Sequence, residues 1–210
     1  MAGEGFFIDH VIYGVVDIDR ACERLRDEHG LGWVEGGRHL GGTTDRFVPL
    51  ADRTFLEVLG VGDTSKDDGA WLEATLQGQD RILWWCLGCD DLDETARRRG
   101  LPVQVGAAHD IEGNEQTFRT AGMPRYPLPF FMAAPGSLEY RTRLWQERYE
   151  KAGHTSAPGG FTWIEVGDPP SLIDNWLGPD HGLPVRYAPT AGPGARGVGI
   201  ASADGEIVIR

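Results

Sequence analysis

The stretch from Phe7 to Val16 mixes hydrophobic and polar residues and is rich in β-branched residues, which predicts a strand. One face of this strand would carry Ile8, His10, Ile12 and Gly14. From Asp17 onward the apolar positions take helical spacing, with Asp17 suited to the N-cap and Gly30 to the C-cap. The chain therefore opens with a strand followed by a helix.

Three more strands complete this first unit. Leu31–Val34 predicts a short strand, and Thr43–Leu50 and Arg53–Leu59 predict two longer ones joined by a tight turn. The glycines from Gly36 to Gly42 predict a loop between the first two. The order over residues 6–59 is therefore β-α-β-β-β.

The same order recurs further along the chain. A strand at Ile82–Leu87 precedes a helix that starts at Asp90–Asp93 and ends at Gly100. Three strands follow this helix, at Pro102–Val105, Gln116–Ala121 and Pro129–Ala133. The helix starts of the two copies match, and seven residues before them lie His10 in the first copy and Trp84 in the second. Such a repeat determines the architecture of the whole chain.

A connecting segment and a shorter third copy end the chain. Leu138–Lys151 has the pattern of an amphipathic helix or an extended crossover, and Phe161–Val166 begins a third βαβββ-like series. We therefore expect an α+β protein with paired modules over residues 1–135, a connection over 136–158 and a third, partial module over 159–210. The third module would pack beside the others or pair with a second subunit in a homodimer.

Composition narrows the range of partners. A net charge of −12 over 210 residues argues against nucleic acid and anionic membranes, which attract basic surfaces. No apolar run approaches the ~20 residues of a membrane span, and residues 1–5 lack the basic region of a signal peptide. Three cysteines suggest reduced thiols and a cytoplasmic protein.

Four short stretches and their spacing resemble the vicinal oxygen chelate superfamily, and more narrowly its glyoxalase-like domain proteins. These stretches are Ile8–Val11, Val16–Asp19, Gly36–His39 and Phe55–Val58. The resemblance covers nearly the whole chain and is strongest over residues 6–60. It implies that the paired modules curve into an open barrel around a ligand cavity, with the first and fourth strands of a module side by side. His10 and Glu57 would then meet inside the cavity.

The resemblance also implies a divalent metal ion held by His, Glu or Gln of both modules. His10 and Glu57 would be ligands for Fe, Mn, Ni, Co or Zn, with Glu57 also acting as the catalytic base. The second module departs from the pattern, because Trp84 replaces the histidine and Phe131 or Met132 replaces the glutamate. A third ligand could come from His39, His109 or Glu165. Alternatively, His10 is a core histidine or a metal-free pocket contact, and Glu57 pairs with an arginine such as Arg38.

Other side chains could bind substrate. Glycines around Arg38 and His39 allow close approach of a ligand, and an arginine fork suits carboxylate or phosphate; the alternative is a plain connection that Arg38 anchors. Trp84 would form an aromatic wall. Cys86 and Cys89 superficially resemble a redox dithiol, but the repeat places Cys86 within a strand, whereas such chemistry needs a helix N-terminus.

Three functions remain open at this point. The first is a small-molecule enzyme, namely a metal-dependent lyase, isomerase or dioxygenase. The second is a non-catalytic protein that binds a small molecule, similar to drug-sequestering proteins of the bleomycin resistance type. The third is a structural domain whose own aromatic side chains fill the pocket.

Overall fold

The computed structural model describes residues 6–133 and 137–210, and the first module occupies the start of this range. Its elements are β1 (Phe7–Val15), α1 (Ile18–His29), β2 (Val34–His39), β3 (Thr43–Pro49) and β4 (Phe55–Val61). The N-terminal residues 1–5, on which the signal-peptide expectation rests, lie outside the described residues, as does residue 136 of the expected connection.

The second module repeats the order of the first. Its elements are β5 (Arg81–Gly88), α3 (Leu92–Arg99), β6 (Val103–Asp110), β7 (Glu115–Ala121), the 3-10 turn η1 (Met123–Arg125) and β8 (Phe130–Ala133). The same local devices form both module helices: Asp17 and Asp91 cap the N-termini by accepting from backbone N–H groups, and Gly30 and Gly100 end the helices with positive φ. The internal match read from the helix starts is thus confirmed.

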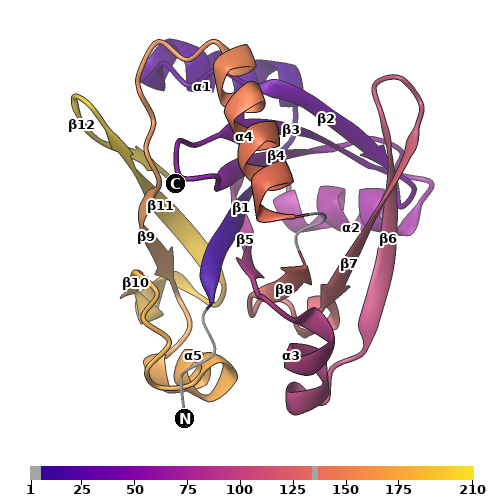
Figure 1. Ribbon diagram of the computed structural model, residues 1–210, viewed down its shortest axis with the longest axis vertical. Helices are drawn as coiled ribbons and strands as arrows, with labels where there is room; N and C mark the ends of the chain where they lie inside the picture. The colour runs from indigo at the N-terminus through magenta and orange to yellow at the C-terminus, as the bar shows by residue number, and fades with distance from the viewer. Residues whose placement is uncertain (1–5, 134–136) are drawn as a thin grey trace.

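Eight strands close into one barrel in the order β1-β4-β3-β2-β6-β7-β8-β5. Within each module the first and last strands pair in parallel, β1 with β4 and β5 with β8. Antiparallel pairs β1–β5 and β2–β6 join the two modules. The α+β class and the curved barrel of paired modules are confirmed (Figure 1). The barrel is closed and not open as expected, because strand pairing continues around the whole ring.

The prediction of a glycine-rich loop over Gly36–Gly42 is wrong for its first half, because Gly36–His39 belong to β2. Arg38 is in register with Thr44 of β3, and His39 is in register with Ala108 of β6. A Cβ atom added to Gly36 would overlap the side chain of Asp45. Glycine therefore serves here to admit a neighbouring side chain to a strand rather than to form a loop.

A helix that the sequence did not predict, α2 (Asp67–Leu76), lies between the modules. Its Lys66 N-cap makes no side-chain hydrogen bond, and only Gly69, Leu72 and Leu76 are buried. The helix thus lacks both the cap and the broad apolar stripe by which a helix is found in a sequence.

The third unit forms a separate sheet beside the barrel, drawn in brown and yellow in Figure 1. Its elements are β9 (Phe161–Val166), α5 (Pro170–Leu177), β10 (Val185–Tyr187), the turn η2 (Pro189–Ala191), β11 (Ala195–Ser202) and β12 (Gly205–Ile209). The sheet order is β10-β9-β11-β12, so its first and last strands are not neighbours, unlike those of the barrel modules. Strand β11 packs against β5 of the barrel.

The connection contains a helix, α4 (Leu138–Ala152), that crosses β2 and β3 and is drawn in orange in Figure 1. Among its described side chains only Ala152 is buried. The C-terminal end is held firmly, because Gly32 N donates to Nδ1 of His154 at 3.0 Å and Thr155 N donates to Gly30 O at 2.9 Å. No helix among the described residues is long and apolar enough to cross a membrane.

Candidate active site inside the barrel

His10 and Glu57 meet inside the barrel, as the resemblance implied. Parallel pairing of β1 with β4 sets Ile12 opposite Glu57 and His10 opposite Phe55, so the two functional side chains lie diagonally on one face. His10 Nε2 is 3.4 Å from Glu57 Oε2, and the residues are only 2% and 8% exposed. The partner of Glu57 is therefore His10 and not Arg38.

Asp9 orients the His10 ring, although adjacent strand residues normally point to opposite faces. The pairing of β1 with β5 slips between Ile8 and His10, and such a bulge lets a strand aim two neighbours to one side. Asp9 Oδ1 accepts from His10 Nδ1 at 2.7 Å. The bond fixes the tautomer and leaves Nε2 facing Glu57.

Two further side chains lie beside Glu57, namely Asp45 of β3 and His39 of β2. The ligand atoms of His39, Asp45 and Glu57 lie within 4.8 Å of one another, and His39 Nε2 is 3.9 Å from Asp45 Oδ2. Asp45 also accepts from the backbone N–H of Gly37, and His39 Nδ1 lies 2.8 Å from Thr43 Oγ1. We call His10, His39, Asp45 and Glu57 the barrel cluster.

The ionisable groups of the barrel cluster shift one another's pKa values. Burial, and next the charge of Glu57, raise the pKa of Asp45 to about 6, while His39, the Gly37 N–H and Arg148 act to lower it. Burial also acts to lower the pKa of His10, but Asp9, Glu57 and Asp45 together outweigh it, so this pKa is raised. Two carboxylates held this close favour a bound cation or a shared proton.

The raised pKa of Asp45 predicts a loss of stability with rising pH in the metal-free protein. Native Asp45 binds its proton more tightly than unfolded Asp45, so the native state is favoured at low pH and penalised as the pH passes from about 4 to about 6. Relative to Asp45→Asn, the free energy of unfolding should fall by roughly 2 kcal/mol over that range. Urea unfolding of both proteins at several pH values measures this difference, and parallel curves would contradict it.

Aromatic rings surround the barrel cluster. His10 stacks on Phe55 at 4.6 Å and meets the edge of Phe130 at 5.7 Å. Trp84 packs on Phe130 at 4.6 Å and donates from Nε1 to Leu128 O at 2.6 Å. The second module therefore lines the site with Trp84 and Phe130, an aromatic wall that carries no metal ligand.

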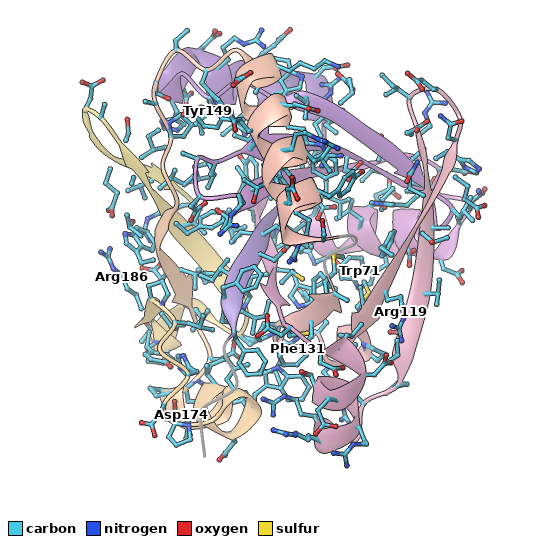
Figure 2. All side chains as sticks on the ribbon, viewed as in Figure 1. Trp71, Arg119, Phe131, Tyr149, Asp174 and Arg186 are labelled. Atoms are coloured by element: carbon cyan, nitrogen blue, oxygen red, sulfur yellow. The ribbon has the colours of Figure 1, made fainter. Side chains whose placement is uncertain are left out.

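Several other predicted residues lie elsewhere. Arg38 is exposed and in register with His109 of β6, on the face of β2 opposite His39. Glu165 pairs with Arg210 in the third sheet at 2.7 Å. Phe131 points away from His10 and packs on Phe6 at 5.3 Å (labelled in Figure 2). Of the substrate contacts expected from the sequence, His39 and Trp84 are thus near the cluster and Arg38 is not.

Sequence reasoning missed Asp9 and Asp45. For Asp9 the sequence held no signal, because its orientation depends on a bulge. For Asp45 a signal existed: Asp45 lies opposite Leu59 and Phe47 lies opposite Glu57 in the β3–β4 pair, so all four share one face once the register is known.

The barrel cluster fits a divalent metal ion. Two imidazoles and two carboxylates are donors that Fe, Mn, Co, Ni and Zn accept. The ligand atoms of His39, Asp45 and Glu57 lie close enough together to hold one ion, and His10 Nε2 lies beside this set, 3.4 Å from Glu57 Oε2. Each histidine also has a hydrogen-bonding partner at Nδ1, which is typical of metal-bound imidazoles.

Cys86 lies near Asp9 and His10, but its thiol is an unsuitable ligand or redox group. Burial raises the pKa of Cys86 well above its usual range and raises that of Cys22 to about 11, whereas the reactive form is the thiolate. Cys22, Cys86 and Cys89 are all buried and are thiols rather than disulfides.

We therefore expect the native protein to react slowly with an aromatic disulfide reagent at neutral pH. Unfolded protein should release three thiol equivalents at once, one for each cysteine. The measurement is the absorbance of the released thiolate with and without denaturant. A fast-reacting thiol in native protein that disappears in Cys86→Ser or Cys89→Ser would restore the redox interpretation.

One family model and several solved structures match the chain. A family model described as a glyoxalase-like domain matches residues 8–177. No curated protein matches the chain. Among solved structures, a hypothetical protein from Staphylococcus aureus has a TM-score of 0.61 at 14% identity, covering 82% of this chain and 75% of that one.

Methylmalonyl-CoA epimerases are more distant structural neighbours. The Mycobacterium tuberculosis enzyme has a TM-score of 0.43 at 19% identity, covering 63% of this chain and 91% of its own. The Streptomyces coelicolor enzyme has a TM-score of 0.47 at 19% identity, covering 62% and 95%.

Proposed function

Because the chain belongs to the family of glyoxalase-like domain proteins, we propose that it is a small-molecule enzyme whose reaction centre is the barrel cluster with one divalent metal ion. The observation that carries this proposal is the buried pair of His10 and Glu57 at 3.4 Å, with Asp9 behind the imidazole. Asp45 and His39 would complete a four-ligand set.

Bound there, the metal would act as a Lewis acid that polarises substrate oxygen atoms and stabilises a developing negative charge. Asp9 holds His10 in the tautomer that presents Nε2 to Glu57. Glu57 offers two oxygens, of which one can bind while the other accepts a proton from the substrate. The rings of Phe55, Phe130 and Trp84 keep water from the reacting atoms.

Metal analysis tests this proposal. Protein purified without an affinity tag or chelator should contain nearly one equivalent of metal, or take it up from Fe, Mn, Co, Ni or Zn salts. His10→Ala should weaken metal binding by roughly ten- to a hundredfold, because the imidazole beside Glu57 is lost while His39, Asp45 and Glu57 remain. Wild-type protein that stays metal-free after incubation with all five salts would contradict the proposal.

A second candidate function is metal-free binding of a small molecule, and one observation favours it. In the second module Trp84 takes the place of His10. Cys86 pairs with Phe130 as Ile12 pairs with Glu57, so Phe130 takes the place of Glu57, and the expectation of Phe131 or Met132 there is wrong. Both Trp84 and Phe130 are buried. If metal uptake fails while the tryptophan fluorescence of the barrel responds to apolar small molecules, this binding function becomes the better description.

A further inference from the structure

A hollow of about 270 Å³ lies on the surface between α4 and the turn from β3 to β4. Leu50 and Arg53 come from the turn, and Thr142, Trp145, Gln146 and Tyr149 come from α4. Figure 2 labels Tyr149 near the C-terminal end of this helix. The volume is near the lower end for small-molecule pockets, which suits a ligand with about one ring.

The hollow differs in charge from the rest of the chain. The protein has 32 acidic residues and a net charge of −12, yet none of the described residues that line the hollow is acidic. Its one charged side chain is Arg53, and hydroxyl and amide groups can donate further hydrogen bonds. Such a lining favours a negatively charged ligand.

The backbone of Arg53 adopts a conformation that is unusual for arginine. Its φ is +76°, a conformation that glycine adopts freely and arginine does not. The turn enforces it, because Arg53 N donates to Leu50 O at 3.2 Å and Thr54 N donates to Asp52 Oδ1 at 3.0 Å. An arginine at such a position points to a function for its guanidinium.

That guanidinium has little else to bind. Nη1 is 3.3 Å from Thr142 Oγ1, and Nε is 3.4 Å from Asp52 O. Within the part of the chain that the structure describes, no carboxylate forms a salt bridge with it. The planar fork therefore remains available to a ligand at the rim of the hollow.

Trp145 supplies an aromatic surface and a route to the barrel cluster. It lines the hollow and also stacks on Phe55 at 4.5 Å, and Phe55 stacks on His10 at 4.6 Å. A planar ligand in the hollow would thus be separated from the barrel cluster by two stacked rings.

From these features we infer that the hollow binds a small aromatic carboxylate, with the ring against Trp145 and the carboxylate on Arg53. The inference rests on the turn, on α4 and on the absence of acidic lining among the described residues. It requires neither a bound metal nor the reaction proposed above.

Titration of the metal-free full-length protein with benzoate and with its neutral analogue benzamide tests the inference. Isothermal titration calorimetry gives the affinities, and the indole N–H signal of Trp145 reports the location of binding. We expect benzoate to bind roughly tenfold more tightly than benzamide, since a charge-assisted contact is worth about that factor. Arg53→Gln should remove most of this preference, and Trp145→Leu should weaken both ligands by about tenfold.

Two further variants separate binding from structure. Arg53→Gly should raise the melting temperature, because it relieves the strained backbone, and should lose the preference for benzoate all the same. Arg143→Gln changes an exposed arginine of α4 that lies 3.9 Å from Glu147, and it should bind like wild type. Any one of three results would overturn the inference. They are equal affinities for benzoate and benzamide, an undiminished preference for benzoate in Arg53→Gln, and signals that shift at His10 and not at Trp145. Because no metal is present, these failures would leave the metal analysis unaffected.

Discussion

Replacing Glu57 by glutamine is expected to lower the metal affinity of the protein by at least about a hundredfold, and to abolish turnover of any substrate that depends on the metal. The amide keeps the size of the side chain but removes a charged ligand. Glu57 lies 3.4 Å from His10 Nε2, and its charge also acts on Asp45. Even residues that only orient ligands change metal affinity by roughly ten- to a hundredfold, so a direct ligand should change it more. Calorimetric titration of metal-free protein with the preferred ion measures the effect.

Glu147→Gln is the matched control for this experiment. Glu147 is an exposed carboxylate on α4, and its substitution should leave metal affinity within error of wild type. Circular dichroism should show that both variants are folded. A Glu57→Gln protein that binds metal as tightly as wild type would place the ion elsewhere, for example among Asp9, His10 and Cys86.

Trp85→Ala is expected to destabilise the protein by about 3–5 kcal/mol, the usual range when a large aromatic core residue is truncated. Trp85 is 1% exposed and is among the largest fully buried side chains. It follows Trp84 on β5 and so points to the outside of the barrel, where β11 packs against this strand. The cavity would open between the barrel and the third sheet. Chemical denaturation followed by fluorescence and by circular dichroism measures the loss.

Trp71→Ala is the control for this prediction. Trp71 lies on α2, is 37% exposed and is labelled in Figure 2, so its loss should cost no more than about 1 kcal/mol. A small effect of Trp85→Ala would mean that the third sheet adjusts to fill the space. Two separate unfolding transitions in the wild type would mean that the sheet and the barrel unfold independently.

Much of the fold could be predicted because its signals are local. Asp17 and Gly30 mark the ends of α1, and the same pair of residue types marks α3. Alternation along β1 placed His10 on one face, and the resemblance to a known family placed β4 beside it. Helix α2 escaped prediction because it has neither a capping side chain nor a broad buried stripe.

Of the barrel cluster, only Asp45 was not predicted. His10 and Glu57 follow from strand alternation together with the family resemblance, and His39 was one of three candidates for a third ligand. A full set of neighbours requires the register between strands, which depends on contacts across the sheet. Asp45 joins the cluster only through the β3–β4 register, and Asp9 only through a slip in β1–β5 pairing. The glycines of β2 are ambiguous in a sequence. Glycine allows a flexible loop, but in a strand it also makes room for a neighbouring side chain, as Gly36 does for the carboxylate of Asp45.

All four members of the barrel cluster come from β1 to β4, so one half of the barrel holds the whole candidate ligand set. The other half contributes aromatic walls and no donor atom to it. Substitutions at Trp84 and Phe130 can therefore change the aromatic wall while the candidate ligands stay in place, as long as β5 keeps the register slip that turns Asp9 toward His10. The proposed metal ion would restrict the residues that the first half can carry, whereas packing alone would restrict the second.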